Sequence, residues 1–169
     1  MRVLLIVCFF LTSCATVIDS PYGPKIDDWA DRETACQNYP TYRTNPAFEI
    51  DTGQLEEMSR GISCTIGYLS DETEYWQTSC ETLERKTGDC EDMAILLYAR
   101  LRDAGWPDDI IGIMIIKWIE EASHAVVGVK YKRAYLIADP TGLFGYEIFS
   151  SDRIEPIVWF NLWEVEELR

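Results

Sequence analysis

Two side chains suited to nucleophilic chemistry are Cys90 and His124, the single histidine of the chain. Cys90 lies in Gly88-Asp89-Cys90-Glu91-Asp92, directly before a strong helical pattern that runs from Met93 to Ala104. Asp89 is a suitable N-cap and Asp92 completes a capping-box pattern, so we expect Cys90 to be the first residue of the helix. The helix dipole favours a thiolate there, whereas the adjacent carboxylates oppose it. A basic partner is therefore required, and His124 lies in a strand-like run.

The same residues have a simpler interpretation. Cys90 can be a buried cysteine under an acidic helix cap, and His124 a core histidine whose hydrogen bonds are satisfied. Asp139, which precedes Pro140, can equally be a turn residue at the end of a strand.

The elements that must position these residues fall into two groups. Apolar residues at helical spacing predict a helix over Gln54–Leu69, followed by a short helix around Cys80–Lys86 and the central helix, which Gly105 and Pro107 end. We then expect strands at Ile110–Ile119, Ser123–Lys132, Ala134–Asp139, Leu143–Phe149 and Ile157–Leu162, the last of which can also be an aromatic C-terminal segment. Helices followed by strands predict an α+β domain, in which a mostly antiparallel sheet packs on one central helix.

The strand pattern also predicts how two polar side chains meet. If residues 132–133 form a hairpin turn, antiparallel pairing places Val126 opposite Asp139. His124 is then the diagonal neighbour of Asp139 on the same face, about 7–8 Å away and within reach of its side chain. A turn with an odd number of residues would place the two on opposite faces.

Several short motifs carry a family resemblance. They are Trp76, Thr78, Glu81, Gly88-Asp89-Cys90-Glu91-Asp92, Ala94, Leu101, Gly105, Ser123-His124-Ala125-Val126 and Asp139-Pro140-Thr141. In this order they resemble the transglutaminase-like superfamily over roughly residues 54–142, and are most similar to the bacterial transglutaminase-like cysteine proteinases. The resemblance implies a papain-like α+β fold, with Cys90 as the nucleophile, His124 as the base and Asp139 as the residue that orients it.

The implied activity is attack on protein or peptide amide bonds, with peptide hydrolysis as the first expectation. Ser79 stands where the proteinases often have proline, and Asp139-Pro140-Thr141 resembles the general transglutaminase core. A transglutaminase, a deamidase or a non-catalytic binding module of the cell envelope therefore stay as alternatives. The Cys90 backbone N–H is an expected oxyanion donor, with Trp76 or Gln77 as candidates for a second one.

The resemblance also implies a metal. The proteinases bind calcium through acidic residues beside their cysteine, and Asp89, Glu91 and Asp92 stand at the matching positions. Hard oxygen ligands suit this ion, but helix capping explains the same carboxylates. No other cofactor is expected.

The N-terminus predicts export. Met1–Ser13 has a charged start, Arg2, and an apolar run too short to span a bilayer. Leu11-Thr12-Ser13-Cys14 matches the bacterial lipobox, which implies cleavage before Cys14 and its lipidation, although an ordinary secretory signal is the alternative. Ala15 after the cysteine resembles the outer-membrane sorting pattern, so we expect an envelope lipoprotein facing the periplasm.

Charge limits the partners. After removal of residues 1–13, 14 basic residues face 29 acidic ones and the formal charge is −15. Such a chain is a poor ligand for nucleic acid or anionic membranes. The partner that the resemblance implies is a protein or peptide substrate, and we expect a monomer.

We expect three segments: the signal 1–13, a lipidated tether and docking segment 14–53, and the transglutaminase-like domain 54–169. Val17–Gly53 contains four prolines and predicts irregular structure, mobile to about Asp28, with docking through Trp29, Tyr39, Tyr42 and Phe48.

Three further cysteines remain in the exported chain: Cys36, Cys64 and Cys80. An oxidising compartment favours one disulfide among them. Cys64 falls off the apolar stripe of its helix and should face outward, so Cys36–Cys64 is our first expectation and Cys64–Cys80 the alternative. One thiol is left over in either case.

Overall fold

The computed structural model describes residues 21–37, 42–119 and 122–168. The predicted signal and Cys14 lie outside these residues. The helices are α1 (Gly23–Gln37), α2 (Thr52–Ser63), α3 (Ser79–Arg85), α4 (Cys90–Asp103) and the 3-10 turn η1 (Ser151–Arg153). The strands are β1 (Gly67–Tyr68), β2 (Thr87–Gly88), β3 (Ile111–Ile119), β4 (Ala122–Tyr131), β5 (Ala134–Ala138), β6 (Phe149–Ser150), β7 (Glu155–Phe160) and β8 (Val165–Glu167).

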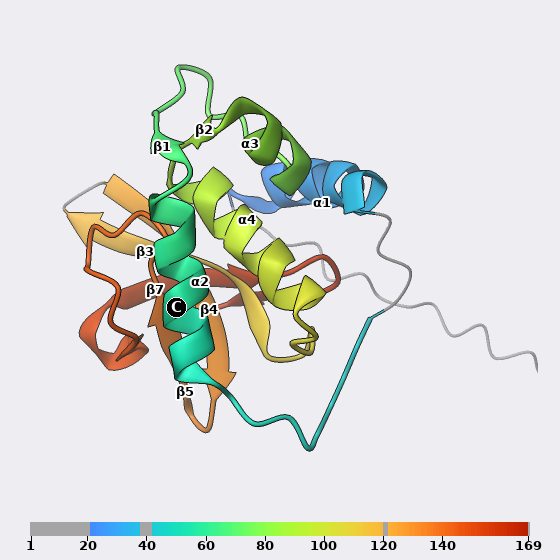
Figure 1. Cartoon of the computed structure of the whole chain (residues 1–169), viewed down its shortest axis with the longest axis vertical. Helices are drawn as coiled ribbons and strands as arrows, with labels where there is room; N and C mark the ends of the chain where they lie inside the picture. Colours follow the sequence, from blue (N-terminus) through green and yellow to red (C-terminus); the bar gives the residue numbers. More distant parts are fainter. Residues whose placement is uncertain (1–20, 38–41, 120–121, 169) are drawn as a thin grey trace, which may run out of the picture.

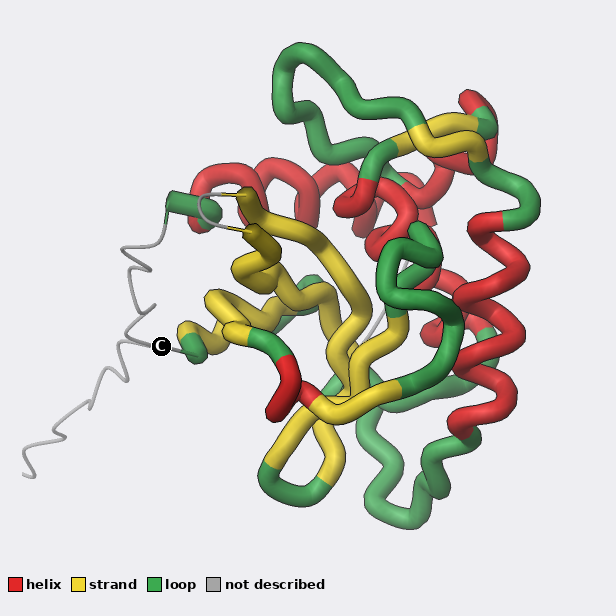
Figure 2. The backbone as a smooth tube through the Cα atoms, turned by 90° about the vertical axis from the view of Figure 1, so that its left-hand side faces the viewer, coloured by secondary structure: helices red, strands yellow, loops and turns green. Residues whose placement is uncertain are grey.

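The strands build one main sheet. Its six strands run in the order β6-β5-β4-β3-β7-β8 and every neighbouring pair is antiparallel. A separate pair, β1 and β2, is parallel and only two residues long. Figures 1 and 2 show the larger helices gathered on one side of the sheet. The predicted α+β class, with a mostly antiparallel sheet, is confirmed.

Helix α4 occupies the centre of the fold. Its residues 93–99 and Leu101 are buried, as expected for a helix that is apolar on most sides. It packs against β3, whose Ile113 and Ile115 point toward the helices, while Met114 and Ile116 join a second core on the far face. Alternation along β3 thus supplies both faces of the sheet with apolar side chains.

The prediction of irregular structure over Val17–Gly53 is wrong for Gly23–Gln37, which forms α1. Trp29 is fully buried and packs edge-on to Tyr98 and Phe160. Pro24 lies in the first turn, where a helix tolerates proline because the N–H there has no intrahelical partner. Proline thus begins this helix and does not interrupt it.

The predicted disulfide is also wrong. Cys36 in α1 is bonded to Cys80 in α3, with Cα atoms 6.1 Å apart. Cys64 faces outward as expected, but it is a free thiol at the C-terminal end of α2. Both predicted pairings involved Cys64 because α1, which brings Cys36 to α3, was not predicted.

Smaller differences concern element ends. Helix α2 stops at Ser63 instead of Leu69, and Thr65 Oγ1 donates to the Gly61 carbonyl beyond its end. Of the predicted strand Leu143–Phe149 only Phe149 is in β6, because the chain first turns through Gly142 and Gly145, both at positive φ. Strand β8 was not predicted. None of the described helices is long and apolar enough to cross a membrane.

Candidate active site

Cys90 is the first residue of α4, as predicted, and Asp89 is the N-cap. The Asp89 backbone N–H donates to Asp92 Oδ2 at 3.2 Å, as in a capping box. Gly88 fits only as glycine, because a Cβ there would lie 2.6 Å from the Cβ of Asp92. The motif thus turns sharply from β2 into α4 and places the thiol at the positive end of the helix.

The β4–β5 hairpin has the predicted register. Tyr131 pairs with Ala134 and Val127 with Ala138, and Lys132 in the turn adopts a φ of 57°. His124 and Asp139 therefore come together: His124 Nε2 lies 3.2 Å from Asp139 Oδ1. The contact is the one predicted for a two-residue turn at residues 132–133.

Asp139 is held as an anion. Thr141 donates its backbone N–H and its hydroxyl to Oδ1, and the Phe144 N–H donates to Oδ2 at 3.0 Å. Burial acts to raise the pKa of Asp139, but these bonds, together with the hydrogen bond and charge of His124, lower it below the usual value. An ionised carboxylate only accepts, so His124 carries its proton on Nε2 and Nδ1 is the nitrogen that can take a proton.

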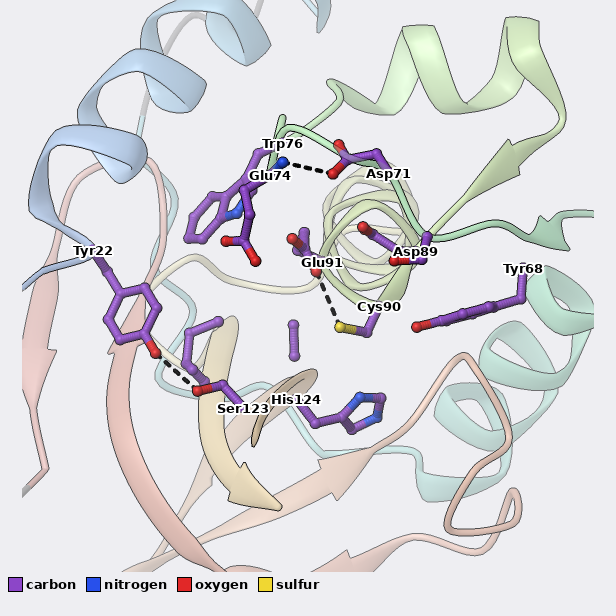
Figure 3. A pocket seen from close by; sticks show the side chains of 13 residues that line it. Tyr22, Tyr68, Asp71, Glu74, Trp76, Asp89, Cys90, Glu91, Ser123 and His124 are labelled. Atoms are coloured by element: carbon purple, nitrogen blue, oxygen red, sulfur yellow. Dashed lines mark hydrogen bonds between the residues drawn. The ribbon is translucent and has the colours of Figure 1, made fainter. Parts of the chain in front are cut away.

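A cavity of about 410 Å³ opens beside the thiol. Figure 3 shows Cys90 and His124 facing it from α4 and β4. Asp139 is not one of its lining residues and is almost fully buried. The lining residues are Tyr22, Tyr68, Ser70, Asp71, Glu74, Trp76, Asp89, Cys90, Glu91, Ile115, Ser123, His124 and Ala125.

The thiol is in a protonated resting state. Cys90 Sγ donates a hydrogen bond to Glu91 Oε2 at 3.0 Å, drawn as a dashed line in Figure 3. Burial, followed by the charge of Glu91, raises the pKa of the Cys90 thiol far above its usual value, and a backbone hydrogen bond from Ala125 only partly opposes this. Burial and the Glu91 charge therefore both oppose thiolate formation at Cys90.

Two of the three predicted metal ligands lie close together. Burial and the charge of Asp89 raise the pKa of Glu91 to about 7. Asp89 is itself buried, with a pKa raised mainly by burial, and its Oδ1 has no hydrogen-bond partner within the described part of the chain. An orphaned oxygen beside a second carboxylate is a favourable place for a cation.

Asp92 does not join them. Its Oδ1 accepts the Gln77 backbone N–H at 2.7 Å, and its Oδ2 accepts the N–H of Asp89 and the Gln77 side-chain amide. Burial raises its pKa to about 6. Over the described ranges, no group of three or more His, Cys, Asp or Glu side chains is arranged to hold a metal ion.

The two candidates for a second oxyanion donor, Trp76 and Gln77, differ in their position relative to the cavity. Trp76 lines the cavity and stacks on Phe160, whereas the Gln77 side chain is bonded to Asp92 and is not a lining residue. Sequence reasoning missed Tyr22, Tyr68, Asp71 and Glu74. Tyr22, Asp71 and Glu74 come from stretches without periodicity, and Tyr68 lies at the end of the helix predicted over Gln54–Leu69, beyond the point where α2 stops.

With this geometry described, comparison with known proteins decides the family. The sequence profile of the bacterial transglutaminase-like cysteine proteinases matches residues 25–142, well over half of the chain. This chain belongs to that family of cysteine proteinases. The matched range begins within α1, upstream of Trp76, the first residue of the motifs that carry the resemblance. A search of the curated proteins gives no match.

Solved structures agree with the family fold. LapG of Legionella pneumophila is 19% identical, covers 82% of this chain and 85% of its own, and superposes with a TM-score of 0.61. A calcium-bound structure of the same protein is 18% identical, covers 82% of this chain and 87% of its own, and has a TM-score of 0.56. At this identity the likeness establishes the proteinase family's fold for this chain and nothing finer.

Proposed function

We propose that this family member is a thiol peptidase in which Cys90, His124 and Asp139 act as a catalytic triad. The observation that carries the proposal is the 3.2 Å contact from His124 Nε2 to Asp139 Oδ1, with His124 and Cys90 lining one cavity. Nucleophile, base and orienting carboxylate are the three groups that thiol catalysis needs.

In the proposed reaction, His124 Nδ1 takes the thiol proton and Cys90 Sγ attacks the carbonyl carbon of a substrate amide. A C–S bond forms while the carbonyl π pair moves to oxygen. Collapse of this intermediate breaks the C–N bond, and the leaving amine takes the proton from the imidazolium. Water then attacks the thioester and releases the carboxylic acid and the thiol. Asp139 stays ionised and stabilises the imidazolium. If an amine replaced water as the acceptor, the same steps would give transamidation.

Glu91 is the group that restrains this reaction at rest. As long as its charged carboxylate accepts the thiol proton, Cys90 stays protonated. We propose that calcium binding at Asp89 and Glu91 relieves the restraint, with support from the orphaned Asp89 oxygen and from the calcium-bound state named for one LapG structure. When bound, the ion supplies positive charge beside the thiol. Asp92 is left to its structural role.

The proposed setting is the bacterial cell envelope. The lipobox at Leu11–Cys14 supports a lipid anchor, and Ala15 supports the outer membrane. The substrate is then a protein or peptide of the envelope, in keeping with the proteinase family.

The test is the pH dependence of iodoacetamide alkylation at Cys90, followed by residue-resolved mass spectrometry with calcium present. A Cys64→Ser background removes the exposed thiol. We expect His124→Ala to slow the alkylation sharply near neutral pH and to shift its midpoint to higher pH, because the imidazole then no longer offsets the burial that raises the pKa of the Cys90 thiol. Coinciding profiles in wild type and His124→Ala would reject the triad and favour a binding module.

A further inference from the structure

Tyr68 is held beside the nucleophile by the short parallel pair β1–β2. The Gly67 N–H donates to the Lys86 carbonyl and the Leu69 N–H donates to the Gly88 carbonyl, each at 2.9 Å. In this register Tyr68 lies opposite Gly88, two residues before Cys90. The strand that leads into α4 therefore also fixes the backbone of Tyr68.

The Tyr68 side chain reaches the cavity from this position. Its ring is a lining residue but is 61% exposed, which is unusual for so large an aromatic side chain. Figure 3 shows its hydroxyl directed toward Cys90, on the side of the thiol opposite the Glu91 carboxylate. Leu69, the next residue, is similarly exposed.

The charges around the thiol make a donor at this place useful. Attack on an amide puts negative charge on the carbonyl oxygen, yet four carboxylates line the cavity: Asp71, Glu74, Asp89 and Glu91. These carboxylates repel an oxyanion. The oxyanion is therefore stabilised only where it lies away from the carboxylates and next to hydrogen-bond donors. A tyrosine hydroxyl keeps its proton at neutral pH, so Tyr68 can donate.

We propose that the Tyr68 hydroxyl is an oxyanion donor, acting together with the backbone N–H of Cys90 at the start of α4. This assignment rests on the proposed thiol chemistry. In the addition step the C–S bond forms, the carbonyl π bond breaks and its electron pair goes to oxygen. Tyr68 donates a hydrogen bond to that oxygen and keeps its proton. The residue touches the reacting atom and is in this sense catalytic.

Two probes distinguish stabilisation of the oxyanion from reactivity of the thiol. The sulfur of Cys90 attacks the aldehyde carbon of acetyl-Leu-Leu-argininal, and this addition creates an oxyanion. The positively charged guanidinium of the inhibitor suits the acidic cavity. Iodoacetamide is attacked at a saturated carbon, so its reaction creates no oxyanion at the site. The experiment measures protection of Cys90 from iodoacetamide by the aldehyde, in the Cys64→Ser background with calcium present. The variants are Tyr68→Phe and a control, Tyr131→Phe, at the far end of β4 from His124.

We expect Tyr68→Phe to weaken aldehyde protection by about 10- to 100-fold, the lower range for loss of one oxyanion donor. Its iodoacetamide rate should stay within about twofold of the wild-type rate, since the thiol and His124 are unchanged. Tyr131→Phe should change neither quantity.

Equal aldehyde protection in wild type and Tyr68→Phe would overturn the assignment. So would a parallel loss of both reactions, which would make Tyr68 a group that governs the thiol itself. Failure of the proposed function gives a different result: Cys90 of the Tyr68-intact protein would then show no His124-dependent alkylation at all, and the assignment would fall with it.

Discussion

Asp92 accepts the backbone N–H of Gln77 at 2.7 Å, across 15 residues of sequence. The carbonyl of the same peptide unit, that of Trp76, accepts a hydrogen bond from Arg32 Nη2 at 2.9 Å. One peptide in the cavity wall is therefore held from two sides, by α4 and by α1. Helix α1 thus helps to shape the site, although the sequence suggested a tether and an irregular docking segment there.

The first prediction separates this role of Asp92 from metal binding. Asp92→Asn keeps the shape but presents an amide to the Gln77 and Asp89 donors, so at least one buried hydrogen bond is lost. We expect a loss of about 1–3 kcal/mol in the free energy of unfolding, measured with urea at pH 7.5. Asp27→Asn, on an exposed position of α1, is the matched control and should change little.

Calcium should still raise the melting temperature of Asp92→Asn, starting from the lower baseline. Asp89→Asn and Glu91→Gln should abolish that rise. If Asp92→Asn alone removes the rise in melting temperature with calcium, Asp92 is a calcium ligand, and its assignment to a purely structural role is wrong.

The second prediction concerns pH and Glu91. Burial and the charge of Asp89 raise its pKa in the folded protein to about 7, from the usual 4.5 of a glutamate. Between these values the folded state binds more protons than the unfolded chain, so stability falls as pH rises through this window. In the absence of calcium we expect Glu91 to account for on the order of 2 kcal/mol of this fall.

Urea unfolding of Glu91→Gln between pH 4.5 and 8 checks this, because glutamine cannot titrate. The variant should show a flatter decline than wild type, and the difference between the two curves should grow through pH 5–7. Parallel curves would mean that the pKa of Glu91 is not raised by folding, and would contradict this prediction.

The third prediction concerns Asp139. Asp139→Asn still offers an oxygen to His124 Nε2, but it removes the charge that stabilises the imidazolium. We expect the rates at which Cys90 adds to the aldehyde and is alkylated by iodoacetamide to fall by about 10²- to 10⁴-fold. The fall should be smaller than for His124→Ala. Asp152→Asn, exposed in η1, serves as the control. An Asp139→Asn variant with wild-type rates would leave His124 acting without an orienting carboxylate.

The fourth prediction concerns the disulfide. Cys36 and Cys80 are separated by 44 residues, and a loop of this size constrains the unfolded chain by about 3–4 kcal/mol in the entropic account. The Cys36→Ser, Cys80→Ser double variant should lose about that much unfolding free energy in urea. Cys64→Ser should lose almost nothing. If a reducing agent destabilises the double variant as much as the wild type, the bond is not the cause.

Local patterns predicted where Cys90 stands and, for a two-residue turn, that His124 meets Asp139, while the family resemblance supplied their catalytic roles. Capping residues located the start of α4 at Cys90, and alternation with a two-residue turn located His124 beside Asp139. Both inferences use only neighbouring residues or one hairpin, where the chain itself sets the geometry.

Features that depend on distant packing were not predictable in this way. Helix α1 is stabilised by burying Trp29 against Tyr98 and Phe160, far away in sequence. The Cys36–Cys80 bond follows from that docking. Tyr68 owes its place beside Cys90 to two backbone hydrogen bonds between β1 and β2, which leave no periodic pattern. Contacts between residues distant in sequence determine each of these features, and the local patterns of a single sequence do not reveal such contacts.

The last prediction concerns anchoring. Lipidation before export to the outer membrane requires a cysteine at the end of the lipobox, and Cys14 is the residue that meets this requirement. Cys14→Ser should therefore leave the membrane fraction of bacterial cells, or accumulate with an uncleaved signal. Cys8→Ser is a matched control, because Cys8 lies inside the apolar run and would be removed with the predicted signal. Fractionation with mass spectrometry of the N-terminus reports both location and processing. Cys14→Ser protein that stays in the membrane with a normally trimmed N-terminus would show that something other than a lipid on Cys14 holds it there.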